Sequence, residues 1–150
     1  MMNKTTKERT LETHLRYFNT YKVAIANCEK QLEWIMPSLV SQFTVDNGFS
    51  VFHIGNNTER VAIDRIESKR ALDLREEIEK NKIIVESIEL AFSELKDQEQ
   101  DFVKLRYFEC LPMHEVKKEL GYAEEKSIYR IRRHVLDKLL ISLNNLFVLK

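Results

Sequence analysis

The sequence predicts an all-α protein, and three observations support that class. Only three glycines and two prolines occur in 150 residues, which leaves few tight turns and favours long helices. Apolar residues recur at helical spacing over most of the chain. The clearest breaks, at Leu111-Pro112 and Gly121, fall late and divide the C-terminal third into short helices. We therefore expect a long N-terminal helical hairpin in residues 1–95 and a C-terminal three-helix helix-turn-helix domain in residues 96–150.

Residues 8–36 are predicted to form one amphipathic helix. Pro37 is expected to end it, because the residue before a proline avoids the helical region. The apolar stripe of this helix comprises Leu11, Leu15, Phe18, Ile25, Leu32 and Ile35. Its aromatic residues and its lone histidine are expected to be structural, because such side chains in a helix more often pack in a core than bind a ligand. These residues are His14, Tyr17, Tyr21 and Trp34.

Residues 38–57 have a different character. They are β-prone around Asn47-Gly48, and a short β-hairpin and a long ordered loop are both compatible with this pattern. A second long helix is predicted over residues 59–94, with Thr58 as its N-cap. Its narrow apolar stripe comprises Ile66, Leu74, Ile78, Val85, Ile88 and Phe92. Such a helix needs a partner, which is either the 8–36 helix in an antiparallel pair or a second copy of the chain in a homodimer.

The C-terminal third is predicted to begin with a helix that starts at Asp97. Gln100 stands where the second partner of a capping box belongs. The buried stripe of this helix is expected to comprise Phe102, Val103, Leu105 and Phe108. Because proline is tolerated at a helix start, Pro112 is expected both to end this helix and to open the next one, over Met113–Leu120.

Gly121 then fits the left-handed position that commonly closes a helix. The third helix is predicted over residues 124–143. The turn after Gly121 is one residue longer than is usual between two such helices, so the start of the third helix stays open. Its apolar face comprises Ile128, Ile131, Val135 and Leu139.

The third helix carries a local excess of positive charge. Five basic residues and one acidic residue lie between Lys126 and Lys138, although the whole chain has 24 basic and 24 acidic residues and no net charge. A basic helix after a short helix and a glycine turn is typical of proteins that place this helix in the major groove of DNA. A basic helix face can also be simply solvated. The candidate DNA-binding residues are Lys126, Ser127, Tyr129, Arg130, Arg132, Arg133 and His134.

The C-terminal third resembles region 4 of the sigma-70 family and the helix-turn-helix of response regulators. The residues that carry the resemblance are Leu105-Arg106-Tyr107-Phe108, Glu115-Val116, Glu119-Leu120-Gly121, Ser127 to Arg133 and Leu136-x-x-Leu139. The layout of the whole chain is similar to the phage late-gene regulators of the RinA/ArpU type, including the stretch Gly55 to Ala62. The resemblance implies a transcriptional activator of phage or prophage late genes, such as packaging and lysis operons. It also implies RNA polymerase as a second partner, contacted through the acidic helical half.

Two other interpretations stay open. One is a sigma-like subunit that binds core RNA polymerase and has little affinity for free DNA. The other is a helical scaffold or interaction protein whose helix-turn-helix only packs.

Several classes of protein are disfavoured by the sequence. We expect no enzyme, no cofactor and no metal site, because phosphate loops, nucleophile motifs and metal-ligand spacings are not found. Cys28 and Cys110 lie far apart and are expected to be reduced, packed thiols. No apolar run approaches the length that spans a bilayer, and the N-terminus has no apolar signal core. We therefore expect a cytoplasmic protein in a bacterial host cell that has no membrane partner.

Overall fold

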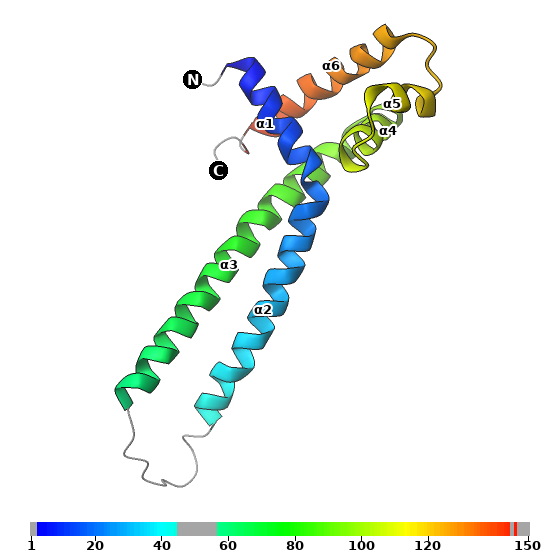
Figure 1. Cartoon of the computed structure of the whole chain (residues 1–150). Coiled ribbons are helices and arrows are strands. Elements are labelled where there is room, and N and C mark those ends of the chain that lie inside the picture. Colours follow the sequence, from blue (N-terminus) through cyan, green and yellow to red (C-terminus); the bar gives the residue numbers. More distant parts are fainter. Residues whose placement is uncertain (1–2, 45–56, 145, 147–150) are drawn as a thin grey trace. The chain divides into compact units, whose positions relative to one another are not determined.

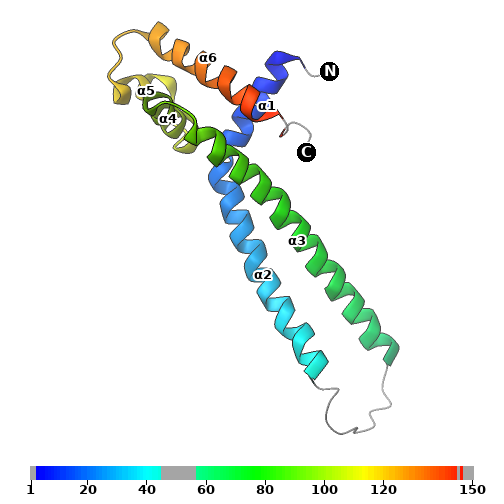
Figure 2. The same cartoon turned by 180° about the vertical axis from the view of Figure 1, so that it is seen from behind.

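The computed structural model describes residues 3–44, 57–144 and 146, and all regular structure in these ranges is helical (Figures 1 and 2). The all-α prediction is confirmed. The chain divides into two compact units. One contains residues 1–22 and 82–150, and the other contains residues 23–81. The first is called the composite unit below, because it joins both ends of the chain, and the second is called the hairpin unit.

The single helix predicted over residues 8–36 is in fact two helices. Helix α1 spans Lys4–Arg16 and helix α2 spans Phe18–Thr44. The break falls at Tyr17, whose φ is −89° and ψ is 7°. It lets the buried ring of Phe18 stack on Phe108, with 4.6 Å between ring centroids. Tertiary packing therefore redirects the chain at a point where the helical periodicity of the sequence is continuous.

Pro37 does not end the helix, contrary to the sequence prediction. Helix α2 continues past it to Thr44. A proline inside a helix removes one backbone hydrogen bond and costs about 3 kcal/mol, but it does not prevent the following residues from being helical. The segment predicted as a β-hairpin or loop is thus helical over residues 38–44, and residues 45–56 lie outside the described ranges.

Helix α3 spans Asn57–Ser93 and pairs with α2, as the antiparallel-pair prediction required (Figure 1). The expected stripe is only partly buried. Ile78, Val85 and Ile88 are buried, whereas Ile66 is 67% exposed. A pair of helices has one shared interface, so an apolar side chain that points away from it meets no second layer.

The expectation that the aromatic residues of the first helices form core is wrong for two of them. Trp34 is 86% exposed and Tyr17 is 52% exposed. Tyr21 is partly buried, and its hydroxyl lies 2.8 Å from Nδ1 of His14. Burial lowers the pKa of His14, so the neutral ring is favoured and a structural role fits this pair.

The C-terminal third contains the three expected helices. Helix α4 spans Asp97–Val103, α5 spans Met113–Leu120 and α6 spans Glu125–Ser142. The predicted cap is shifted by one residue. The backbone N–H of Lys96 donates to the carboxylate of Glu99 at 3.2 Å, so Glu99 and not Gln100 occupies the reciprocal capping position.

A π-helical turn, η2, spans Lys104–Phe108 and continues α4. Its signature is the bond from the N–H of Glu109 to the carbonyl of Lys104 at 2.8 Å, five residues back. This turn changes which side chains are buried. Tyr107, five residues after the fully buried Phe102, is itself 0% exposed, while Leu105 and Phe108 are only partly buried. The predicted stripe assumed 3.6 residues per turn, and the π turn breaks that periodicity.

The core of the composite unit joins both ends of the chain. Helix α1 contacts η2 and α6, and Leu11 and Leu15 on α1 are each 1% exposed. The buried apolar residues of the C-terminal helices are Phe102, Val103, Tyr107, Val116, Ile128, Val135, Leu136, Leu139, Leu143 and Leu146. Residue 95 is therefore not a boundary between compact units, because α1 packs with the helices that follow it.

Candidate nucleic-acid interface

The connection between α5 and α6 is a short turn built on a left-handed glycine. Gly121 has φ 74° and ψ 23°, as the sequence predicted. The N–H of Tyr122 donates to the carbonyl of Lys117 and the N–H of Gly121 donates to the carbonyl of Lys118, each at 3.1 Å. These two bonds form a Schellman motif, which satisfies carbonyls that the end of a helix leaves free. The direction in which α6 leaves the turn is therefore fixed by the backbone.

The open question about the start of the third helix is answered by the fold. Helix α6 begins at Glu125, with Glu124 as its extended N-cap residue. Its buried face comprises Ile128, Val135, Leu136 and Leu139. Ile131, expected on this face, is only partly buried.

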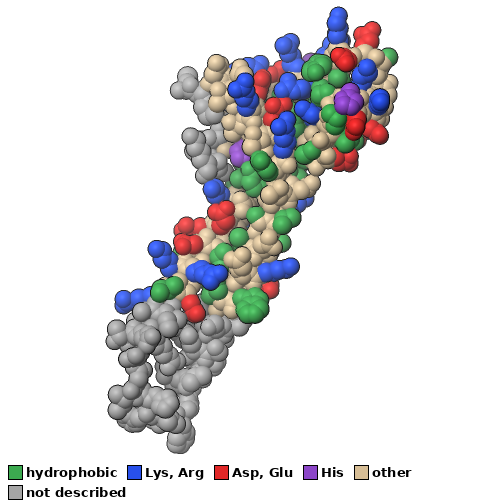
Figure 3. All heavy atoms as spheres, viewed as in Figure 1, with side chains coloured by type: hydrophobic (Ala, Val, Ile, Leu, Met, Phe, Trp, Pro, Cys, Tyr) green, Lys and Arg blue, Asp and Glu red, His purple; other side chains and the backbone are tan. Residues whose placement is uncertain are grey.

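Three basic side chains define the exposed face of the first half of α6. Lys126, Arg130 and Arg133 are exposed, and Tyr129, beside them, is 54% exposed. No residue in the described ranges forms an ion pair with any of the three. We call Lys126, Arg130 and Arg133 the basic face of α6. Figure 3 shows Lys and Arg side chains gathered over the surface formed by α1 and α6, with acidic side chains among them.

The basic face borders a shallow depression along α6. Its lining residues are Glu125, Lys126, Tyr129, Arg130, Arg132 and Arg133. Five of the seven predicted candidates line this depression: Lys126, Tyr129, Arg130, Arg132 and Arg133. Ser127 is partly buried in the first turn of α6, and His134 is exposed just after Arg133.

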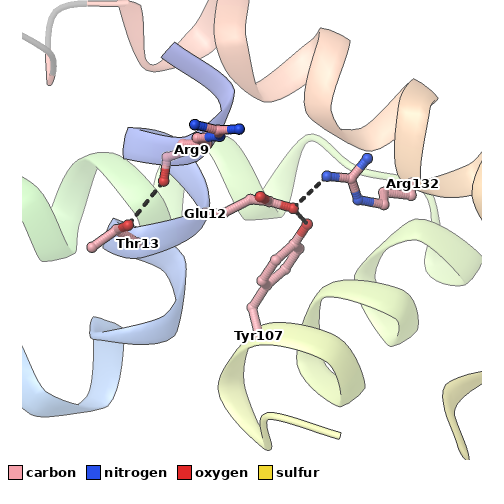
Figure 4. A network of polar contacts seen from close by, with 5 residues as sticks. All are labelled: Arg9, Glu12, Thr13, Tyr107 and Arg132. Carbon is pink, nitrogen blue, oxygen red and sulfur yellow. Dashed lines mark hydrogen bonds and ion pairs between the residues drawn. The ribbon is translucent and has the colours of Figure 1, made fainter. Parts of the chain in front are cut away.

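Arg132 differs from the other four, because its guanidinium is bound within the protein. Its terminal nitrogen donates to Oε1 of Glu12 on α1 at 2.7 Å, and the hydroxyl of Tyr107 donates to the same oxygen at 2.9 Å (Figure 4). We call Glu12, Tyr107 and Arg132 the Glu12 cluster. Burial alone would lower the pKa of Arg132, but the hydrogen bond and the charge of Glu12 raise it. Burial and the adjacent carboxylate also raise the pKa of Tyr107, so its hydroxyl remains a donor.

Two more charged residues of α6 are bound to neighbouring helices. The Nζ atom of Lys138 donates to both carboxylate oxygens of Glu99, at 2.8 and 2.9 Å. Asp137 lies 3.2 Å from Nζ of Lys4. Burial of the Glu99 carboxyl raises its pKa, but the bonds from Lys138 and from the N–H of Lys96 outweigh burial and lower it. Helix α6 therefore has cations of two kinds, those bound to an acid and those of the basic face.

We did not predict from the sequence that Glu12, Glu99 and Tyr107 take part in the polar contacts of α6. Glu12 and Arg132 are 120 residues apart, and Glu12 and Tyr107 are 95 apart. No local spacing connects such residues. The one available signal was the position of Glu12 between Leu11 and Leu15, at the edge of a buried stripe.

The two cysteines differ in their surroundings. Cys28 is partly buried, but Cys110 is exposed and has a positive φ of 56°, so the prediction of packed thiols is wrong for Cys110. Its thiol donates to the carbonyl of Tyr107 at 3.2 Å. Cys110 also lies beyond the end of η2 and not on a helix.

In the described part of the chain, no helix has the length and apolarity needed to cross a membrane. The same residues contain no group of three or more His, Cys, Asp or Glu side chains that could hold a metal ion. No family model, curated protein or solved structure matches this chain.

Proposed function

We propose that this protein is a sequence-specific DNA-binding transcriptional regulator that inserts α6 into the major groove. The observation that carries the proposal is the division of the α6 cations into two kinds. Arg132 and Lys138 are bound to acids of neighbouring helices, whereas Lys126, Arg130 and Arg133 are exposed and have no ion-pair partner among the described residues. A group of exposed cations that have no ion-pair partner among the described residues, on one helix of a protein with no net charge, suits a specific, salt-sensitive DNA contact.

The geometry of α5 and α6 also supports this proposal. In helix-turn-helix proteins the second helix lies in the major groove, and its N-terminal residues contact the base edges. The basic face occupies the corresponding half of α6. An arginine can pair with two acceptors of guanine, so Arg130 and Arg133 are assigned to bases. Lys126 and Ser127, in the first turn, are assigned to phosphates.

The regulatory role is a finer part of the same proposal, and it rests on the resemblance to the phage late-gene regulators. It comprises activation of phage or prophage late genes in the bacterial cytoplasm and contact with RNA polymerase. A homodimer would add a second α6 and would double the DNA contact over two half-sites. These parts concern how bound protein acts, and the DNA contact can be tested without them.

The DNA contact is tested with a duplex selected from a randomised library by the purified protein. Arg130→Ala and Arg133→Ala are each expected to weaken binding to this duplex by roughly 5- to 150-fold, the range for loss of one base contact worth about 1–3 kcal/mol. The measurement is fluorescence anisotropy at a fixed salt concentration. The control is Arg65→Ala, which removes an exposed arginine from α3 and is expected to leave affinity unchanged.

Two outcomes would count against the proposal. If both α6 variants bind like the wild type, the basic face is not the DNA contact. If the wild type has little affinity for free DNA but is retained by core RNA polymerase in a pull-down, the sigma-like interpretation is favoured instead.

A further inference from the structure

The Glu12 cluster joins three segments of the composite unit at one carboxylate oxygen. Oε1 of Glu12 accepts from Tyr107 on η2 at 2.9 Å and from Arg132 on α6 at 2.7 Å (Figure 4). The Glu12 side chain is only 15% exposed, and that of Arg132 is 32% exposed. The arginine is therefore partly open to solvent, while its acidic partner is mostly enclosed.

The position of Arg132 gives this bond a consequence for the surface. Arg132 lines the same depression as Lys126, Arg130 and Arg133. If its guanidinium were released from Glu12, it would lie beside the basic face and could reach a phosphate, because an arginine side chain is long and always charged. The Glu12 carboxylate both neutralises this cation and holds it toward α1.

A phosphate contact of this kind adds affinity for every DNA sequence equally. Each cation that neutralises a phosphate releases about 0.9 counterion and carries no base information. One more phosphate contact therefore strengthens random-sequence binding and lowers the ratio of specific to non-specific affinity. An acid that withdraws such a cation has the opposite effect.

We infer that Glu12 is a specificity-determining residue, which withholds Arg132 from the phosphate backbone and leaves the basic face to contact DNA. This inference rests on the proposed function. It assigns to α1 a role in setting the charge that α6 presents to DNA. Glu12 is then a positioning residue that acts through Arg132, and Arg132 itself is not a DNA contact.

The test measures how affinity for a random-sequence duplex changes with KCl between about 50 and 200 mM. Glu12→Gln keeps the size of the side chain and removes its charge. It is expected to steepen the slope of log affinity against log salt by about 0.9 and to raise non-specific affinity by up to about eightfold at ~0.1 M salt. Arg132→Ala alone is expected to leave the wild-type slope unchanged, and the double variant Glu12→Gln/Arg132→Ala is expected to restore it.

Glu8→Gln is the matched control. Glu8 lies one turn before Glu12 on α1 and is also near Arg132, but no hydrogen bond joins it to that arginine. The Glu8→Gln substitution removes the same charge from the same helix, so it measures how net charge alone changes the salt dependence of DNA binding. Its slope is expected to match that of the wild type.

The outcomes separate this inference from the proposed function. If the wild type binds the random-sequence duplex without salt dependence, and Lys126→Ala binds it identically, both the proposed function and this inference are overturned. A slope that is shallower by about 0.9 for Lys126→Ala, the lysine assigned to a phosphate, supports the DNA contact. The inference is then overturned if Arg132→Ala also loses about 0.9 of slope, or if a folded Glu12→Gln variant binds like the Glu8→Gln control. If Glu12→Gln does not fold, a loss of about 0.9 of slope in Arg132→Ala still overturns the inference.

Discussion

The composite unit and the hairpin unit use apolar residues in different ways. In the composite unit, helices from both ends of the chain surround a common core, and Phe102, Tyr107 and Val116 are fully buried. In the hairpin unit, the buried apolar side chains among the described residues are Ala71 and Ile78, while Trp34 and Ile66 are largely exposed. A helix surrounded on several sides can bury a wide stripe, whereas a helix with one neighbour buries only a narrow one.

The difference teaches that the same amphipathic pattern has two structural outcomes. Periodicity says which side chains share a helix face, but it does not say how many neighbours that face will meet. Burial in the composite unit depends on α1, which supplies Leu11 and Leu15 from the far end of the sequence. We therefore expect substitutions in the two units to differ sharply in their effect on stability.

The largest effect is expected for Phe102→Ala, which should lower the free energy of unfolding by about 3–5 kcal/mol. The ring is 0% exposed, so its removal loses apolar burial and leaves a cavity. Urea unfolding followed by circular dichroism measures the change. A loss below 1 kcal/mol, on the order of a surface substitution, would remove the contrast between the two units.

A smaller effect, about 1–2 kcal/mol, is expected for Lys138→Ala, which leaves the nearly buried carboxylate of Glu99 without its main partner. The Lys138 side chain is 44% exposed, so solvent screening keeps the effect below that of a fully buried pair.

The same pair predicts the direction of a pH dependence. The folded pKa of Glu99 is lowered from 4.5, so its contribution to stability is present above that value and is lost as the pH falls toward the folded pKa. Wild-type stability should fall on acidification in this window, and Lys138→Ala should show a shallower fall. Urea unfolding at several pH values measures this dependence. If the free energy of unfolding falls equally steeply with falling pH in both proteins, the Lys138–Glu99 pair is not its cause.

Gly121→Ala is expected to lower the free energy of unfolding by about 1 kcal/mol. An added Cβ would have no atom within 4 Å, so the strain of a positive φ is the whole effect. Gly121→Asn should cost less, because asparagine tolerates the left-handed region better. If alanine and asparagine destabilise equally in thermal melts, backbone strain at this turn is not the cause.

The smallest effect is expected for Trp34→Ala in the hairpin unit, within about 0.5 kcal/mol. The side chain is 86% exposed and has little burial to lose. Chemical denaturation of this variant beside Phe102→Ala makes the comparison direct. A loss of several kcal/mol for Trp34→Ala would show that its surface is covered in solution.

Local signals in the sequence were enough to predict most of the fold. The all-α class, the helices near residues 97, 113 and 125, and the left-handed Gly121 all follow from composition, periodicity and turn chemistry. The break at Tyr17, the passage of α2 through Pro37 and the π turn did not follow. Each depends on packing or on a hydrogen-bond pattern that residue propensities do not encode.

The sequence predicted which cations of the candidate interface are exposed, but not which of them are bound by other parts of the protein. The exposure of Lys126, Arg130 and Arg133 agrees with their predicted place on α6. The withdrawal of Arg132 could not be predicted, because its partner Glu12 lies 120 residues away and α1 was expected to belong to the other half of the chain. A charge on a helix face is predictable from sequence, but its partner across the fold is not.

The packing of α1 against η2 and α6 also has a consequence for synthesis. Chains are made from the N-terminus, so α1 emerges long before the helices that cover it. Leu11 and Leu15 stay without their core, and Glu12 without Tyr107 and Arg132, until translation has passed residue 132. The composite unit therefore closes late, by joining its first helix to its last. For the same reason, a fragment of residues 96–150 would contain α6 but would lack the Glu12 carboxylate that holds Arg132 in place.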